Sequence, residues 1–137
     1  FFRNCYHWMK PNTYLVVHLV DTNKFTNMIP YNETYNEEKR TGSHRKITTN
    51  AMFSDYEYKC SLTIPNDNNQ SNSQLNETFV DIETNHIRQN EFKLYMDSIE
   101  QIIKIASNNG FIIKGKVDMQ SSNGDKNQYL YILERPL

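Results

Sequence analysis

A run of seven residues, Tyr14 to Val20 (YLVVHLV), constrains the fold of this chain more than any other stretch. It is apolar except for His18 and rich in valine, a residue that favours strands. A polar turn precedes the run, and Asp21 follows it. This pattern predicts a strand buried on both faces in the middle of an α/β sheet. The backbone N–H and C=O groups of such a strand need a neighbouring strand on each side.

Length, charge and cysteine content narrow the class of protein. The 137 residues suffice for one domain, and the net charge of -1 gives no general attraction to nucleic acid or to anionic membranes. We find neither a secretory signal nor a run of the roughly 18 apolar residues that a membrane span needs. Cys5 and Cys60 form no CxxC pattern, which argues against a disulfide framework and against a metal site. We therefore expect a cytoplasmic protein without a metal.

The segments on either side of the central run predict different structures. Apolar residues spaced by three and four between Phe1 and Met9 predict the end of an amphipathic helix, with Trp8 in the core. The turn that follows contains Asn12, which tolerates a left-handed backbone. Thr22 to Arg45 is polar and predicts an irregular segment. Its basic cluster, residues 39–46, is interpreted as a solvated loop, with contact to phosphate or nucleic acid as the alternative.

The middle of the chain predicts an antiparallel β meander over residues 47–95. Apolar and polar residues alternate most strictly from Tyr56 to Ile64, as expected for a half-buried strand. Pro65 to Asn76 is polar and of low complexity, and predicts a linker or hairpin tip. The four predicted strands are Ile47–Phe53, Tyr56–Ile64, Phe79–Ile82 and Ile87–Tyr95.

The C-terminal third predicts a helix followed by two strands. The helix begins at the capping pattern formed by Asp97 and Glu100 and ends at Gly110, which suits a left-handed C-cap. A strand over 111–119 leads to an Asn123-Gly124 hairpin turn, and Tyr129 to Leu133 returns antiparallel.

Three stretches of the chain carry a resemblance to a known family. FFRNCYHWMKPNTYLVVHLVD (1–21) resembles the W-L-K-P-G-G-x-L-V-V segment that leads into the fifth strand of class I S-adenosylmethionine-dependent methyltransferases. LYMDSIEQIIKIASNNGFIIKGKVDM (94–119) is similar to the family's Y-T-x-E-E-L-x-x-L-L-x-x-A-G-F helix and sixth strand. NQYLYILERP (127–136) resembles its antiparallel seventh strand.

The resemblance implies a fold class and a division into domains. The fold class is α/β: the C-terminal half of a Rossmann-like methyltransferase sheet, strands five to seven with the last one antiparallel, and an inserted antiparallel β meander. Residues 1–21 and 95–137 would form this half, and residues 22–94 an inserted loop and meander subdomain that covers the substrate. The strand Tyr14–Val20 would pair with Tyr129–Leu133 on one side and with a strand outside this chain on the other.

The chain departs from the family where the cofactor would bind. The Gly-Gly turn of the family is Asn12-Thr13 here, and the four glycines are scattered without a GxG pattern. In the family, S-adenosylmethionine is held by the first four strands, which this chain lacks. The resemblance thus implies a cofactor bound mainly by sequence outside this chain. It also implies a partner for the central strand, either a missing N-terminal half or another chain.

Two residues at the end of the central strand are candidate catalytic groups. Ligands of open α/β sheets bind beyond the carboxyl ends of the strands, where His18 and Asp21 lie. A histidine or a carboxylate there can take the proton of a hydroxyl or amine acceptor during methyl transfer. The structural alternatives are a buried, hydrogen-bonded core residue for His18 and a turn or cap residue for Asp21.

Three tyrosines are candidate substrate-binding residues. Tyr56, Tyr58 and Tyr95 would form an aromatic lid over the acceptor. The alternative is that tyrosines at every second strand position pack within the sheet.

The sequence supports three functional hypotheses. The first is methyl transfer from S-adenosylmethionine to an acceptor, a small molecule or sugar being favoured over an RNA cap or a protein, because the chain lacks an extended basic surface. The second is a non-catalytic interaction module with a degenerate or truncated methyltransferase fold. The third is a complete small α+β binding domain.

Overall fold

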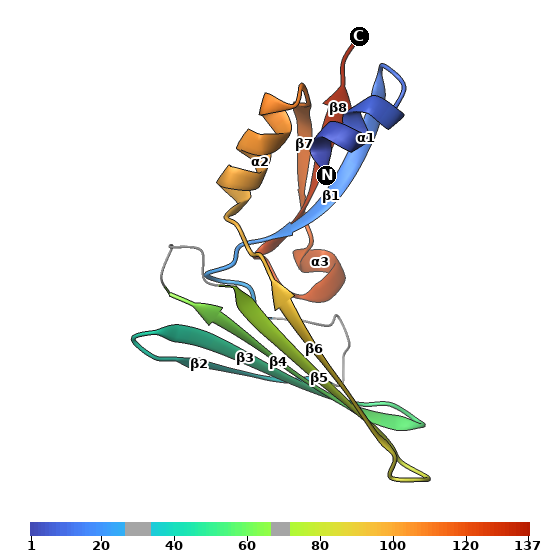
Figure 1. The fold of residues 1–137 in the computed structure, drawn as a ribbon, viewed down its shortest axis with the longest axis vertical. Helices are drawn as coiled ribbons and strands as arrows, with labels where there is room; N and C mark the ends of the chain where they lie inside the picture. Colours follow the sequence, from blue (N-terminus) through green and yellow to red (C-terminus); the bar gives the residue numbers. More distant parts are fainter. Residues whose placement is uncertain (27–33, 67–71) are drawn as a thin grey trace. The chain divides into compact units, whose positions relative to one another are not determined.

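The computed structural model describes residues 1–26, 34–66 and 72–137. It divides into two compact units (Figure 1). Phe1–Phe25 and Asp97–Leu137 make up the first, called here the α/β unit, and Thr26–Met96 make up the second, the meander unit. Each unit has a sheet of its own.

The α/β unit is built around three strands in the order β1-β8-β7, with β8 antiparallel to both neighbours. Val16 pairs with Ile132, and Leu19 with Tyr129. The antiparallel pairing predicted between the central run and residues 129–133 is therefore confirmed. The elements of this unit are α1 (Phe2–Trp8), β1 (Thr13–Val20), α2 (Ile99–Asn108), β7 (Ile112–Asp118), α3 (Gln120–Asn123) and β8 (Gln128–Arg135).

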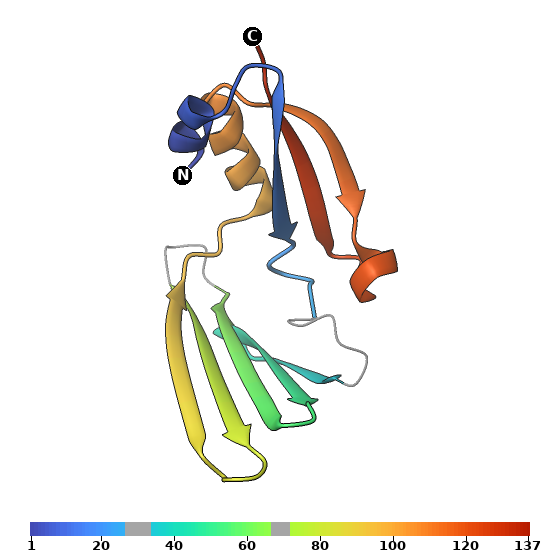
Figure 2. The ribbon, with the colours of Figure 1, turned by 90° about the vertical axis from the view of Figure 1, so that its right-hand side faces the viewer.

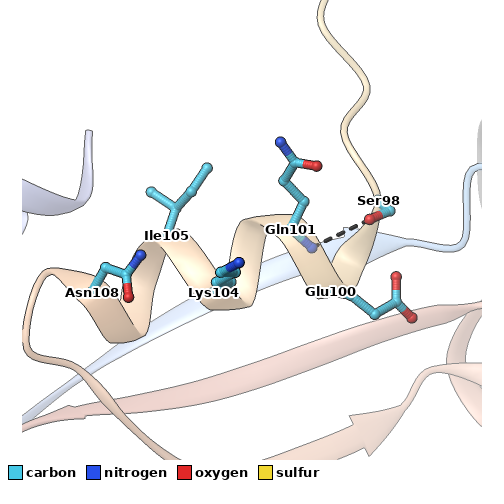
Figure 3. Close-up of a pocket in the computed structure, with 6 residues that line it drawn as sticks. All are labelled: Ser98, Glu100, Gln101, Lys104, Ile105 and Asn108. Carbon is cyan, nitrogen blue, oxygen red and sulfur yellow. Dashed lines mark hydrogen bonds between the residues drawn. The ribbon is translucent and has the colours of Figure 1, made fainter. Parts of the chain in front are cut away.

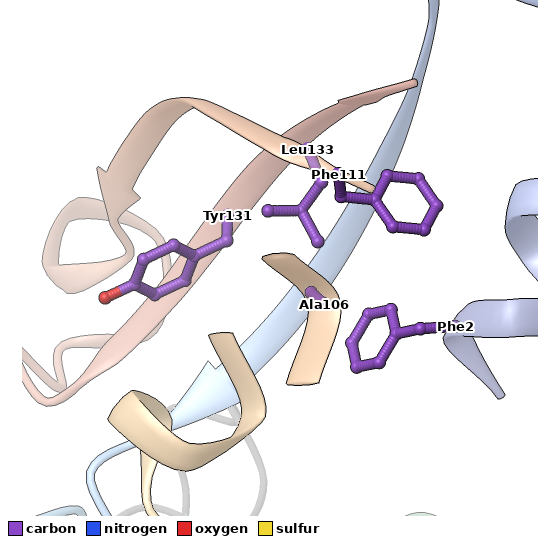
Figure 4. Close-up of a cluster of buried hydrophobic side chains, with 5 residues drawn as sticks. All are labelled: Phe2, Ala106, Phe111, Tyr131 and Leu133. Carbon is purple, nitrogen blue, oxygen red and sulfur yellow. The ribbon is translucent and has the colours of Figure 1, made fainter. Parts of the chain in front are cut away.

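Helices α1 and α2 lie on the same side of this three-stranded sheet (Figure 2). The core between helices and sheet is formed by Phe2 of α1, Ala106 of α2, Phe111 after α2, and Tyr131 and Leu133 of β8 (Figure 4). An apolar stripe of α2 packs against this core, which fixes the helix on the sheet. The stripe consists of Ile99, Ile102, Ile103 and Ala106.

The prediction that the central run is buried on both faces is wrong. Along β1 the side chains alternate, with Leu15 and Val17 packed against the core while Tyr14, Val16 and His18 are exposed. Two helices cover one face of the sheet, and no described element of the unit covers the other. Trp8, predicted in the core, is also exposed, because α1 turns Phe2, Cys5 and Tyr6 toward the core instead.

Local backbone geometry explains where the elements of this unit begin and end. Asn12 adopts a φ of 59° before β1, as the sequence predicts. Gly110 has a φ of 96° and ends α2 in a Schellman motif, in which Phe111 N–H donates to the carbonyl of Ala106. The N-cap of α2 is Ser98 and not Asp97, because the Ser98 hydroxyl accepts from the N–H of Gln101 at 3.2 Å.

The predicted Asn123-Gly124 hairpin turn is replaced by a short helix. The helix α3 ends at Gly124, which takes a φ of 75° and serves as its left-handed C-cap. Glycine has the expected positive φ there, but it ends a helical turn and does not form part of a two-residue hairpin.

The meander unit is a sheet of five antiparallel strands in sequential order. They are β2 (Thr34–Arg40), β3 (His44–Met52), β4 (Tyr56–Pro65), β5 (Ser73–Asp81) and β6 (Ile87–Leu94). The antiparallel meander is thus confirmed, but with five strands where four were predicted. The strand β5 also begins earlier than expected and takes up the end of the predicted polar linker, whose residues 67–71 lie outside the described part of the chain.

The strand missed by sequence is β2, which lies within the segment predicted to be irregular; residues 27–33 of that segment are outside the described part of the chain. Its sequence is rich in charged residues, so it shows no alternation of apolar and polar residues that would predict a strand. Pairing with β3 stabilises it, and the buried Arg45 of β3 donates from Nε to Glu38 Oε1 at 2.8 Å. Tertiary pairing here overrides a weak local preference.

Candidate functional site at the carboxyl end of strand β1

The carboxyl end of β1 runs directly into a turn organised by Asp21. The Asp21 carbonyl accepts from the N–H groups of Lys24 and Phe25, and its carboxylate accepts from Asn23 N–H at 3.1 Å. Lys24 Nζ lies 3.6 Å from the same carboxylate. Phe25 is buried and anchors the end of the turn. Asp21 therefore acts as a turn residue in the structure, and its carboxylate is partly exposed beside a lysine.

A second loop holds this turn in place. Asn127, just before β8, accepts from Asp21 N–H at 2.9 Å and donates from its side-chain amide to the Lys24 carbonyl at 3.3 Å. Asp125 in turn fixes Asn127, because its carboxylate accepts from Asn127 N–H at 2.9 Å. Gln128 donates to the other oxygen of Asp125 at 3.4 Å.

Asp125 and Gln128 are nearly fully buried polar residues, and the sequence analysis did not identify them. The only available signal was Asp125-Lys126-Asn127, a short polar pattern typical of an Asx turn. Nothing in that pattern indicates that the loop folds against the turn after β1. The two loops together give this end of the sheet a defined polar surface.

His18 lies on the same strand as this turn, but it is not the buried core histidine of the structural alternative. Its side chain is exposed, and it belongs to the face of β1 opposite the helices. Its cross-strand partner is Leu130. His18 and Asp21 are thus placed three residues apart at the carboxyl end of β1, one on the open sheet face and one in the turn.

Tyr58 lies in the core of the meander unit. Its ring packs against Phe79 at 5.0 Å between centroids, and its hydroxyl donates to Glu77 Oε1 at 2.7 Å. Burial, followed by the hydrogen bond to Glu77, raises the pKa of Tyr58 well above the usual range. The same burial raises the pKa of the neighbouring Cys60 thiol. Tyr58 therefore stays protonated and acts as a hydrogen-bond donor within the sheet.

The other two tyrosines are more accessible. Tyr56 is partly exposed and stacks on Phe53 at 4.7 Å with an interplanar angle of 22°. Phe79 contacts both Tyr56 and Tyr58, so these two tyrosines belong to one aromatic cluster. Tyr95 follows the end of β6 and is almost fully exposed. The structure therefore places Tyr56 and Tyr58 in one aromatic cluster, and Tyr95 does not belong to it.

The basic cluster of residues 39–46 is not a solvated loop. It forms the end of the β2–β3 hairpin, and Arg40 and Arg45 both pair with Glu38 while Lys39 pairs with Glu37. The hydrogen bond from Arg45 lowers the pKa of the Glu38 carboxyl. This pairing reduces the positive charge that the cluster can offer to a polyanion.

The four glycines lie in different elements and connections of the structure. Gly110 and Gly124 end helices, Gly115 lies in β7 and Gly42 in the β2–β3 connection, so none follows β1. The hollow in Figure 3 is lined only by residues of α2 and its cap, with Gln101 and Lys104 among them. Within the described ranges we find no group of three or more histidine, cysteine or acidic residues suited to a metal. Nor does any described helix have the length and apolar character needed to cross a membrane.

Comparison with known proteins identifies the fold. No family model and no curated protein matches the sequence. Among solved structures, the CcbJ methyltransferase from Streptomyces caelestis has a TM-score of 0.63 at 9% identity, over 99% of this chain and 49% of that chain. An S-adenosylmethionine-dependent methyltransferase from Clostridium acetobutylicum ATCC 824 has a TM-score of 0.53 at 12% identity, over 99% and 50%.

These likenesses define the class of fold. The chain has a mixed α/β structure with antiparallel sheets that is similar to about half of an S-adenosylmethionine-dependent methyltransferase. It spans about half the length of the solved structures it matches.

Proposed function

We propose that this chain forms the substrate-side half of a class I methyltransferase domain, which transfers a methyl group from S-adenosylmethionine to a small-molecule or sugar acceptor. The observation that carries the proposal is the likeness in fold to two methyltransferases over nearly the whole chain. The strand order β1-β8-β7, with the reversed strand β8 in the middle, supports it. In this assignment β1, β7 and β8 are strands five, six and seven of the domain.

The cofactor, which supplies an electrophilic methyl group when bound, is held mainly by polypeptide outside this chain in the proposed enzyme. The scattered glycines, which form no GxG pattern, support this assignment. The 137 residues alone are then expected to be incomplete and inactive.

His18 and Asp21 are the groups of this chain that we propose face the acceptor. His18 is exposed and free to take a proton from a hydroxyl or amine, since its side chain is not part of the core. The Asp21 carboxylate accepts from Asn23 N–H and pairs with Lys24, which restricts its direction, while Asn127 holds the Asp21 backbone. The proposed substrate-binding tyrosines belong to the meander unit, where Tyr56 and Tyr95 are exposed while the buried Tyr58 packs on Phe79, which also contacts Tyr56.

The first experiment is calorimetric titration with S-adenosylmethionine, using this chain alone and the full-length product of its gene. Binding only by the full-length product supports the proposal. Tight binding by the 137 residues alone would place the cofactor pocket within this chain and contradict the division of roles. No binding by either sample would favour the second candidate, a non-catalytic interaction module, which is consistent with an edge of β1 that none of the described strands pairs with.

The role of His18 is tested in the full-length product. His18→Ala should reduce turnover by about 10²-fold or more, the usual contribution of a general base, and leave the unfolding midpoint unchanged because the side chain is exposed. His7→Ala is the matched control, since His7 is exposed on α1. Equal turnover in His18→Ala and His7→Ala would contradict a catalytic role for His18.

A further inference from the structure

Two large aromatic rings are exposed at the two ends of helix α1. Trp8 is 79% exposed and Phe1, the N-cap residue, is 77% exposed. The two residues are about two helical turns apart, so their side chains leave the helix on the same side. Phe2, Cys5 and Tyr6 occupy the inner side, which packs against the core. The rings of Phe1 and Trp8 are therefore not needed for this packing and can contact a partner.

Positive side chains accompany these rings. Arg3 and Lys10 are exposed, and residues 1–13 contain no aspartate or glutamate. In the described part of the chain, neither side chain forms an ion pair. The basic cluster at residues 39–46 differs, because glutamates pair with Lys39 and Arg40 there. The charge at α1 can therefore attract an anionic partner.

Arg135, at the end of β8, adds a further positive charge. Its carbonyl accepts from Asn12 N–H at 2.8 Å, which ties the end of β8 to the turn after α1. Its guanidinium carbon lies 4.8 Å from the centre of the Tyr6 ring, a cation–π contact. Among the described residues, its buried Nε has no hydrogen-bond partner and no carboxylate pairs with the guanidinium. The neighbouring Glu134 instead accepts from Lys114 Nζ at 2.9 Å.

These aromatic and basic residues lie at the opposite end of β1 from His18 and Asp21. Helix α1 leads into the start of β1, where Thr13 pairs with Arg135, whereas Asp21 follows the other end of the strand (Figure 2). A strand of eight residues spans about 25 Å. The surface at α1 is therefore separate from the proposed acceptor site.

We infer that this surface binds single-stranded nucleic acid. Unpaired bases stack on exposed aromatic rings, and the phosphates between them pair with arginine and lysine. A duplex offers phosphates as well, but its bases are stacked on one another and do not reach such rings. The residues of this α1 surface, as it is called below, are Phe1, Arg3, Trp8, Lys10 and Arg135.

An anionic membrane would also attract these charges, but it suits the α1 surface less well. A helix at a membrane interface is held by the apolar area that it buries. Helix α1 has seven residues, and its large exposed apolar side chains are Trp8 and, at its N-cap, Phe1. Planar rings without exposed aliphatic side chains beside them favour stacking on bases.

Trp8 is the single tryptophan of the chain, so tryptophan fluorescence reports on this surface alone. The chain is titrated with an oligouridylate and with an oligothymidylate, each of roughly ten nucleotides. We expect saturable quenching of Trp8, because a base stacks on its ring. With about three phosphate contacts, the affinity should fall roughly 20-fold between about 50 and about 200 mM salt. Such quenching by either oligonucleotide supports the inference.

The double variant Arg3→Gln with Lys10→Gln tests the phosphate contacts. It should weaken binding roughly tenfold at low salt and flatten the salt dependence, because two contacts are lost. The matched control is Lys46→Gln with Lys93→Gln, which removes the same charge from exposed positions of the meander unit. The control should bind as the natural chain does, and equal losses in the two double variants overturn the inference.

Trp8→Ala tests the stacking, with binding measured by the fluorescence anisotropy of a labelled oligonucleotide. It should weaken binding roughly tenfold and leave the unfolding midpoint unchanged, because the ring is exposed. Phe92→Ala, at a position 45% exposed in the meander unit, is the control and should bind normally. The same difference is expected in the full-length product of the gene. Equal affinities of the natural and Trp8→Ala proteins overturn the inference.

Vesicles of phosphatidylcholine and phosphatidylserine supply the competing outcome. A blue shift of Trp8 emission with these vesicles, together with no response to the oligonucleotides, overturns the inference in favour of a membrane surface. No response of Trp8 to any of these probes overturns it as well. The proposed function is judged separately by S-adenosylmethionine binding, which does not involve the α1 surface.

Discussion

The exposed face of the five-stranded sheet in the meander unit carries lysine, glutamate and threonine. The outer face of the three-stranded sheet, which is the face away from α1 and α2, carries valine, leucine and isoleucine. Lys46 and Lys59 are exposed beside the buried Ile47 and Cys60. Buried and more exposed residues thus alternate along β3 and β4 of the five-stranded sheet. A sheet patterned in this way needs cover on one face only.

The three-stranded sheet has no such polar face. Its inner face packs against α1 and α2, yet its outer face is also apolar, with Val16 opposite Ile132. The two sheets therefore differ in how apolar and polar side chains are divided between their faces. A strand that is apolar on both faces is typical of a sheet covered on both sides.

The largest effect that tests this comparison is expected at the inner face of the three-stranded sheet. Leu133 is fully buried, so Leu133→Ala should lower the free energy of unfolding by about 2–5 kcal/mol, measured by urea denaturation. Val16→Ala, on the outer face of the same sheet, should change it by less than about 0.5 kcal/mol in this chain alone. Equal losses would mean that the outer face is already buried in solution.

The next effect is expected in the core of the meander unit. Arg45→Met leaves the Glu38 carboxylate without its buried partner and should cost about 2–3 kcal/mol, less than for a fully buried pair because Glu38 is partly exposed. Lys59→Met breaks the exposed pair with Glu57 and should cost less than about 1 kcal/mol. Similar losses in both variants would contradict the distinction between the two faces.

The Arg45 variant also has a pH signature. The hydrogen bond from Arg45 lowers the pKa of Glu38 in the folded chain. The pair therefore stabilises the folded state fully above the ordinary glutamate pKa of about 4.3, and this stabilisation is lost as the pH falls through the lowered pKa of Glu38. The difference in unfolding free energy between the natural chain and Arg45→Met should therefore narrow in acid. Chemical denaturation at a series of pH values measures it, and a constant difference would exclude this mechanism.

A smaller effect is expected where α2 ends in the α/β unit. Gly110→Ala places a Cβ at a φ of 96° and 2.7 Å from the ring of Tyr6, which joins α2 to α1. We expect a loss of about 1–2 kcal/mol in thermal or urea unfolding. Gly42→Ala is the control, since a Cβ there meets nothing within 4 Å. A neutral Gly110→Ala would show that α1 is not packed against this turn.

The smallest effect is expected at the start of the same helix. Ser98→Ala removes the side-chain acceptor of Gln101 N–H and should cost about 1 kcal/mol. Asp97→Ala should cost less, because Ser98 is the residue that caps α2. A larger loss of stability for Asp97→Ala than for Ser98→Ala would show that Asp97 is the cap, as predicted from the sequence.

Much of the fold could be predicted from local patterns. Strict alternation from Tyr56 to Ile64 predicts β4, the isoleucine stripe predicts the buried face of α2, and Asn12 and Gly110 take the left-handed conformations expected of them. These features depend on periodicity and on backbone sterics, which a single sequence displays directly.

Other features depend on contacts between distant segments, and only the tertiary structure decided them. The strand β2 is charged and is stabilised by its pairing with β3. Arg45 of β3 can be buried because Glu38 of β2 accepts a hydrogen bond from it. The loop at Asp125 fixes the turn at Asp21 across about a hundred residues of sequence, which no local pattern reveals.

The central run shows both contributions together. By itself the sequence determined that Tyr14 to Val20 is an apolar strand fit for burial on two faces. The tertiary structure decided that the side bearing Leu15 and Val17 is the covered one within the α/β unit, because helices α1 and α2 both pack on that side.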